Sequence, residues 1–117
     1  MPELPEIEHV RLSLENKIRF KTIVSCEVKT ANLIKKPDTL EDFKKNIKGL
    51  TFIHLKRRGK YLIMSMDDDY TLIVHLGMTG LFIHVKELNE IPNKYKNHIH
   101  IIIKLNEGYV CYCDIRK

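Results

Sequence analysis

The chain has 117 residues, 44% of them hydrophobic and 30% charged, which is enough for one globular domain with a core and too few for two. Twenty Lys and Arg residues against fifteen Asp and Glu residues give a net charge of +5, which suits a polyanionic partner without requiring one. No apolar run approaches the roughly 20 residues that span a bilayer, and the start lacks the pattern of a signal peptide. We therefore expect a cytoplasmic protein without a membrane partner.

The first predicted element is a helix from about Glu3 to Asn16. Apolar residues recur along it at steps of three and four residues and give it one apolar face: Ile7, Val10, Leu14 and Ile18. Pro5 is tolerated in the first turn, where its missing N–H would have no partner. Glu3 and Glu6 lie at the end where the helix dipole favours negative charge.

Short strands rich in β-branched and apolar residues follow this helix. Their predicted ranges are Thr22–Thr30, Leu50–Arg58, Tyr61–Met66, Tyr70–Leu76, Leu81–Val85, His98–Leu105 and Tyr109–Asp114. A short helix is predicted at Leu40–Asn46, and the charged stretches Leu33–Lys48 and Lys86–Asn97 are expected to be exposed. This pattern predicts an α+β fold, mostly β: a β-sandwich flanked by an N-terminal helix and a second short helix. Because a strand pattern runs straight into Ile115-Arg116-Lys117, we expect a fragment of a longer protein.

The chain has three cysteines, Cys26, Cys111 and Cys113. An odd number without CxxC spacing argues against a disulfide framework and a zinc finger. A Cys2His2 metal site is the alternative, because His98 and His100 precede the two later cysteines and each pair has i, i+2 spacing. Tetrahedral sites more often use tight turns than facing strands. We therefore predict packed thiols and no metal in this segment.

The first residues offer the most specific chemistry. Removal of Met1 would leave Pro2 with a free secondary amine. An α-amino group has a pKa of about 7.7–8.0, against about 10.4 for lysine, so far more of it is unprotonated at neutral pH. Such an amine can attack C1′ of a deoxyribose and form a Schiff base, with Glu3 moving the proton. The residues alone leave open a simple proline-rich helix start with favourable charges.

Four stretches together resemble one enzyme family. The opening Met1-Pro2-Glu3-Leu4-Pro5-Glu6 is similar to the PELPEVE start of the formamidopyrimidine-DNA glycosylase and endonuclease VIII family, and Leu4 is closer to the first branch. Arg57–Leu62 resembles its RRGKYL turn, His75–Gly80 its HLGMSG loop, and Tyr112–Lys117 the start of its DxRRFG or DxRKFG segment. Because the four stretches span the whole chain in order, we identify it as a member, with the N-terminal domain represented.

The resemblance implies roles for particular residues. Pro2 would be the nucleophile, Glu3 the general acid, and Glu6 would have a minor role at the site. Lys60 would hold a DNA phosphate near the reacting sugar, because an ammonium on an exposed turn suits a phosphate. His75 would be a second phosphate contact. Without the resemblance, the residues favour a solvated hairpin charge at Lys60, and for His75 a core histidine at a strand end is the alternative.

Two further residues would enter the duplex. Met78, between two glycines, would fill the gap left when the damaged nucleotide is flipped out. Arg116 would be the second inserted residue and would read the base opposite the lesion. Without the resemblance, Met78 is equally an ordinary core methionine.

The function implied is base-excision repair of damaged double-stranded DNA. The enzyme would remove oxidised purines (8-oxoguanine and formamidopyrimidines) and act as an abasic-site lyase through β,δ-elimination. These residues would need no cofactor; zinc is expected in the C-terminal part of such proteins. The isolated domain would bind DNA weakly in a salt-sensitive way and turn over little.

The alternative function is a non-catalytic, basic β-sandwich module that binds DNA or a protein. A retained Met1 would favour it, because the nitrogen of Pro2 would then be an amide. A homodimer is a further expectation, through a surface left apolar.

Overall fold

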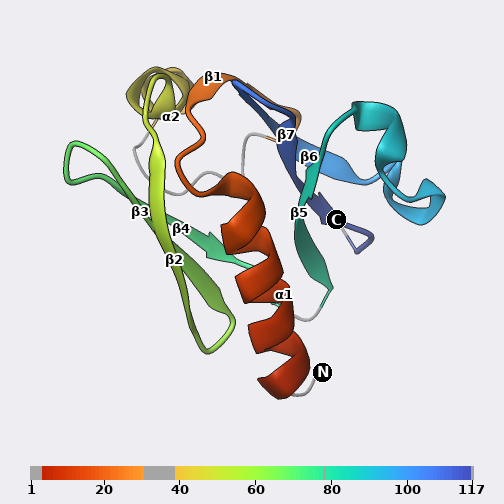
Figure 1. The fold of residues 1–117 in the computed structure, drawn as a ribbon. Helices are drawn as coiled ribbons and strands as arrows, with labels where there is room; N and C mark the ends of the chain where they lie inside the picture. Colours follow the sequence, from red (N-terminus) through yellow and green to blue (C-terminus); the bar gives the residue numbers. More distant parts are fainter. Residues whose placement is uncertain (1–3, 31–38, 78, 117) are drawn as a thin grey trace.

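The computed structural model describes residues 4–30, 39–77 and 79–116, and only the backbone of residues 4–10. Its strands form two antiparallel sheets (Figure 1). The four-stranded sheet has the order β1 (Ile23–Val28), β6 (Ile99–Leu105), β7 (Tyr109–Asp114), β5 (Gly80–Val85). The three-stranded sheet has the order β2 (Phe52–Arg58), β3 (Tyr61–Met66), β4 (Thr71–His75). The helices are α1 (Leu4–Ile18) and α2 (Leu40–Ile47). The predicted β-sandwich flanked by two helices is confirmed.

Apolar side chains from both sheets fill the space between them. The smaller sheet contributes Phe52, Leu55, Leu62 and Met64, and the larger sheet contributes Phe82, Ile103, Leu105 and Val110. Helix α1 adds Leu14 and Ile18, so the apolar face predicted for it is present in its described half. Thr39 is the N-cap of helix α2, and its hydroxyl accepts a hydrogen bond of 3.1 Å from the Asp42 amide.

A second, smaller cluster lies on the other face of the four-stranded sheet. There the segment 86–97, with the short 3-10 helices η2 (Leu88–Glu90) and η3 (Asn93–Tyr95), packs through Ile91, which is 2% exposed. Ile91 contacts a group that includes Cys111 and Cys113. The charged side chains of this segment are exposed as expected, but one buried isoleucine fixes it to the sheet.

Helix α1 is fastened to the outer edge of the smaller sheet by two side chains. The register of β2 shifts between Phe52 and His54, and just beyond it the backbone of Leu55 turns its polar groups towards the helix. The guanidinium of Arg11 donates to the Leu55 carbonyl at 2.8 Å, and the Glu15 carboxylate accepts from the Leu55 amide at 2.8 Å. An edge strand exposes unpaired backbone groups, and α1 satisfies a pair of them.

The β4–β5 connection carries the chain from the smaller sheet to the larger one in a tight turn. Gly77 has a φ of +63°, a region that favours glycine, and the Gly80 amide donates to the Leu76 carbonyl at 2.8 Å. A Cβ on Gly80 would collide with that same carbonyl oxygen, whereas one on Gly77 would meet nothing within 4 Å. The two glycines are therefore required for different reasons, backbone conformation at Gly77 and close approach at Gly80.

No helix among the described residues is long and apolar enough to cross a membrane.

Replacing Glu15 tests the attachment of α1. Glu15→Ala leaves the amide of the buried Leu55 without its acceptor, which is expected to lower the free energy of unfolding by about 1–3 kcal/mol. Asn16→Ala, at an exposed position on the same helix, is the matched control and should change it by no more than about 0.5 kcal/mol. Urea unfolding followed by circular dichroism measures both. Equal losses in the two variants would contradict the assignment.

The two glycines of the β4–β5 connection should respond differently to alanine. Gly77→Ala meets free space and is expected to cost about 1–2 kcal/mol, the penalty of a left-handed alanine. Gly80→Ala must displace the backbone at Leu76 and should lower the unfolding free energy by more than this. Urea unfolding of the pair checks the order, and a Gly80→Ala variant as stable as Gly77→Ala would show that the turn relaxes freely.

Candidate functional site

Lys60 lies at the tip of the two-residue turn that joins β2 to β3. Arg58 pairs with Tyr61 across the hairpin, and Gly59 has a φ of +62° at the first turn position, as in a type II′ turn. The Arg57 guanidinium donates to the Gly59 carbonyl at 3.1 Å and braces the turn. The exposed Lys60 is thus presented to solvent on a fixed backbone, as its sequence position predicts.

His75 is exposed beside this turn. It is the last residue of β4 and pairs with Tyr61 of β3, and the two rings stack with centroids 4.6 Å apart and an interplanar angle of 25°. The Leu76 amide also donates to the Lys60 carbonyl at 3.0 Å. Lys60 and His75 therefore lie together, and the alternative of a core histidine at position 75 is wrong.

A buried carboxylate, that of Asp114, joins the β4–β5 connection to the end of β7. Asp114 is 4% exposed. Its Oδ1 accepts from the Thr79 hydroxyl at 2.6 Å and from the Arg116 backbone amide at 2.9 Å, and its Oδ2 accepts from the Tyr112 hydroxyl at 3.3 Å. Burial, and then the charge of Asp114, raise the pKa of Tyr112 to about 12, so Tyr112 remains a donor at neutral pH.

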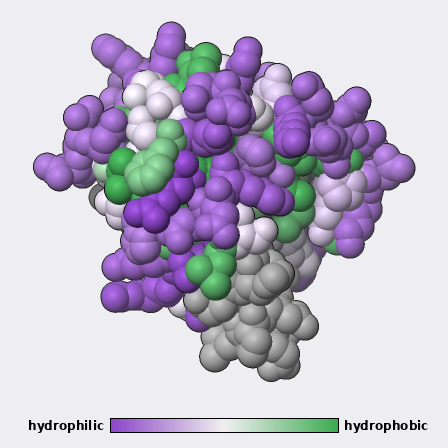
Figure 2. Space-filling model, in the orientation of Figure 1, coloured by the Kyte–Doolittle hydropathy of each residue, from purple (hydrophilic) through white to green (hydrophobic). Residues whose placement is uncertain are grey.

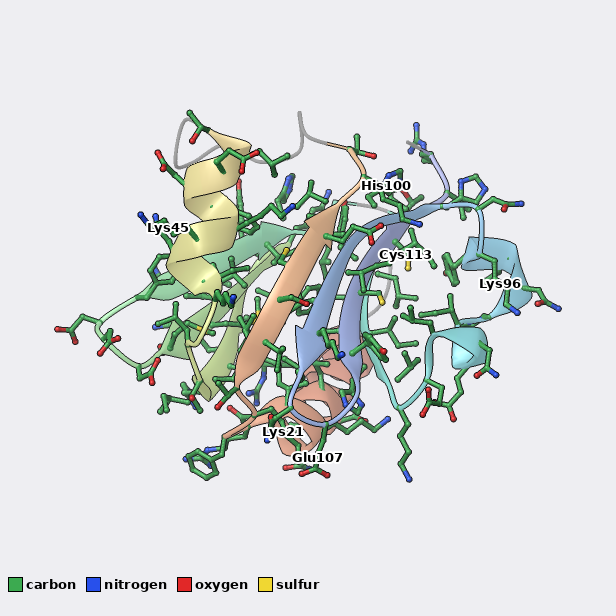
Figure 3. The ribbon with its side chains drawn as sticks, turned by 90° about the horizontal axis from the view of Figure 1, so that it is seen from above. Lys21, Lys45, Lys96, His100, Glu107 and Cys113 are labelled. Atoms are coloured by element: carbon green, nitrogen blue, oxygen red, sulfur yellow. The ribbon has the colours of Figure 1, made fainter. Side chains whose placement is uncertain are left out.

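The four residues of the alternative Cys2His2 site do not converge. Both ring nitrogens of His100 are engaged, Nε2 with the Asp114 carbonyl at 3.0 Å and Nδ1 with the Thr30 hydroxyl at 2.8 Å. Cys111 and Cys113 instead belong to the cluster on the face that carries η2 and η3 (Figure 3). Burial raises the pKa of Cys111 to about 12 and that of Cys113 to about 11, so both are thiols at neutral pH. Within the described residues no group of three His, Cys, Asp or Glu side chains could hold a metal ion.

The elements of the site gather at one end of the sandwich. The first turn of α1, the β2–β3 turn and the β4–β5 connection all lie at the lower end of Figure 1. Contacts join the last two to the end of β7, because the backbone of Lys60 bonds to Leu76 and Thr79 bonds to Asp114. On the face that Figure 2 shows, the described residues are mainly hydrophilic, with isolated hydrophobic residues. The exposed side chains of Arg58 and Lys60 bring positive charge to the β2–β3 turn, which suits an anionic partner.

The structure accounts for part of the predicted site. Lys60, His75 and Arg116 are exposed. Pro2, Glu3 and Met78 lie outside the described residues, as does the side chain of Glu6, so their roles stay predictions.

Two residues that the sequence did not single out belong to the same site: Tyr61, which stacks on His75, and Asp114. The available signal for Asp114 was an acidic residue directly continuing an apolar strand, since a buried carboxylate needs donors.

Known proteins of one family are similar to this chain in both sequence and fold. Residues 1–117 match the sequence profile of the formamidopyrimidine-DNA glycosylase N-terminal domain. The chain is 36% identical to the formamidopyrimidine-DNA glycosylase of Bacillus subtilis and 41% identical to that of Halalkalibacterium halodurans; each match includes the whole chain and 41% of the relative. Among solved structures, the Lactococcus lactis Fpg in complex with DNA containing an abasic site has a TM-score of 0.83 at 36% identity, over 98% of this chain and 41% of that one.

The Lactococcus lactis protein bound to DNA containing Fapy-dG is similar as well, with a TM-score of 0.82 at 37% identity over 97% of this chain. The chain thus spans about two fifths of the length of these relatives. The match over all 117 residues, in sequence and in fold, shows that the chain belongs to the formamidopyrimidine-DNA glycosylase family, as its N-terminal domain.

Proposed function

We propose that this chain supplies the catalytic N-terminal half of the cleft in a DNA glycosylase and abasic-site lyase that removes oxidised purines from double-stranded DNA. The observation that carries the proposal is the placement of Lys60 and His75 at the end of the sandwich where α1 begins, because Pro2 and Glu3 directly precede that helix in the sequence. Two solved structures of one relative, the Lactococcus lactis protein, hold DNA with an abasic site and DNA with Fapy-dG, which supports damaged DNA as the partner.

The proposed chemistry begins with the amine of Pro2 once Met1 is removed. The nitrogen attacks C1′ of the damaged nucleotide, the C1′–base bond breaks, and the base leaves with its electron pair and takes up a proton. Glu3 moves protons for sugar-ring opening and base departure. The product is an iminium that acidifies the C2′ hydrogen, so that elimination removes first the 3′ phosphate and then the 5′ phosphate. No step uses a cofactor held by these residues.

Lys60 and His75 serve the proposal as phosphate contacts. The Lys60 ammonium is a compact, mobile charge on a fixed turn, which allows it to follow a phosphate while the backbone holds position. His75 is exposed beside the same turn, with Tyr61 stacked on one face of its ring. Phosphate contacts of this kind place the sugar without reading the base sequence.

Borohydride trapping tests the nucleophile. The chain, and a hybrid in which it replaces the matching segment of the Bacillus subtilis relative, are incubated with abasic-site duplex and borohydride and analysed by intact mass. We expect an adduct that maps to Pro2 in the hybrid and a much lower yield in the isolated chain. The matched control keeps one residue before Pro2, which turns the nitrogen into an amide and should abolish the adduct.

No adduct from a folded hybrid with a free Pro2 would overturn the proposal and favour the non-catalytic binding module. A comparable yield from the isolated chain would show instead that these residues alone form a sufficient cleft.

A pair of lysine variants tests the phosphate contact. Lys60→Ala should weaken binding of the hybrid to duplexes of any sequence and reduce the slope of log affinity against log salt by about 0.9. Lys45→Ala is the matched control, because Lys45 is also exposed but lies on α2, which is at the upper end of Figure 1. Fluorescence anisotropy with an abasic-analogue duplex at several salt concentrations measures both slopes, and equal slopes would remove Lys60 from the interface.

A further inference from the structure

One oxygen atom joins two separate segments of the site. Oδ1 of Asp114 accepts from the hydroxyl of Thr79, in the β4–β5 connection, and from the backbone amide of Arg116, beyond the end of β7. These two residues are 37 positions apart in the chain (116 minus 79). At 2.6 Å the bond from Thr79 is short, as expected of a hydroxyl that donates to a carboxylate.

Burial of the Asp114 carboxylate costs free energy, and hydrogen bonds to both of its oxygens offset that cost. Asp114 is 4% exposed, and its two oxygens accept hydrogen bonds from Thr79, from the Arg116 amide and from Tyr112. A buried, fully hydrogen-bonded charge adds less stability than an apolar residue of similar size would. Because its hydrogen bonds are directional, it holds the segments that it joins in a single arrangement. Its backbone is fixed as well, since the Asp114 amide donates to the His98 carbonyl at 3.0 Å.

The two donors lie next to, or belong to, the residues that the family resemblance places in the duplex, Met78 and Arg116. Thr79 directly follows Met78, and the second donor is the backbone of Arg116 itself. The tight turn between Leu76 and Gly80 leaves the connection little freedom on its other side. The carboxylate therefore fixes the Thr79 hydroxyl relative to the backbone amide of Arg116.

We propose that Asp114 is a positioning residue for DNA probing: its carboxylate holds the Thr79 hydroxyl and the Arg116 amide so that Met78 and Arg116 enter the duplex as one unit. This inference rests on the proposed function. Insertion into a stacked duplex needs both side chains in place at once, whereas a single-stranded abasic site is already unstacked and needs neither. The role of Asp114 should thus appear on duplex DNA alone.

The experiment compares trapping rates on two substrates, an abasic site in a duplex and the same strand unpaired. Thr79→Val keeps the shape of the side chain and removes the donor; Asp114→Ala is avoided as the main variant because loss of three bonds can prevent folding. In the hybrid, Thr79→Val should slow trapping on the duplex roughly tenfold, as expected of a small misplacement, and change single-strand trapping by less than about twofold. Thr79→Ser, which retains the hydroxyl, should restore the duplex rate.

Thr51→Val is the matched control. The hydroxyl of Thr51 also makes one hydrogen bond, at 2.8 Å to Thr22, and Thr51→Val removes it. This bond joins the two sheets at the start of β2, at the opposite end of that strand from Lys60. The variant should leave both rates unchanged even where the melting temperature falls equally.

The outcomes separate the two proposals. A wild-type hybrid that traps neither substrate overturns the proposed function and this inference with it. A wild-type hybrid that traps both, with Thr79→Val slowing both equally or neither, leaves the function standing and overturns the role of Asp114.

Discussion

The structure depends first on two hydrogen bonds between α1 and the backbone of Leu55. Arg11 donates to the Leu55 carbonyl and Glu15 accepts from the Leu55 amide, so both backbone polar groups of this one residue in the edge strand β2 are bonded to the helix. The bond partners are 44 and 40 positions apart, which makes this a long-range clamp between the start of the chain and the smaller sheet. Glu15 also contacts His54 Nδ1 at 2.9 Å. Burial of Leu14 and Ile18 alone would let the helix slide or roll; the two directional bonds remove that freedom.

The remainder of the site is built where the chain passes from one sheet to the other. Lys60 and His75 belong to the three-stranded sheet, whereas Asp114 ends a strand of the four-stranded sheet, and no backbone ladder connects those strands. The β4–β5 connection bridges this gap with a hydrogen bond at each end, from Leu76 to Lys60 and from Thr79 to Asp114. Sandwich packing alone holds two sheets through apolar contacts, which are non-directional. These polar bonds fix the site residues of one sheet relative to those of the other, which the apolar core alone does not do.

The strands and turns could be predicted from local patterns in the sequence, whereas the contacts between distant residues could not. Alternation and turn residues located the strands, and Gly59 placed Lys60 at a tip, because those signals are local. The Tyr61–His75 stack depends on the register between β3 and β4, and that register could not be predicted from the sequence. Asp114 looked like the end of a strand, since the Thr79 hydroxyl that bonds to its carboxylate comes from a turn 35 positions away. Segment 86–97 looked solvated because one isoleucine among many charges carries its packing.

The position of the clamp on α1 sets how well the start of the chain can be held. With a rise of about 1.5 Å per residue, the seven residues from Leu4 to Arg11 put the start of the helix about 10 Å from the clamp. A tilt of about 6° about Arg11 therefore moves that start by about 1 Å, and a misplacement of about 1 Å can cost a hundredfold in rate. Arg11 and Glu15 lie one helical turn apart, so their two bonds resist both tilt and rotation about the axis. In the proposed function the amine of Pro2 precedes this helix in the chain, so its aim would depend on Arg11 and Glu15 without either side chain approaching the DNA.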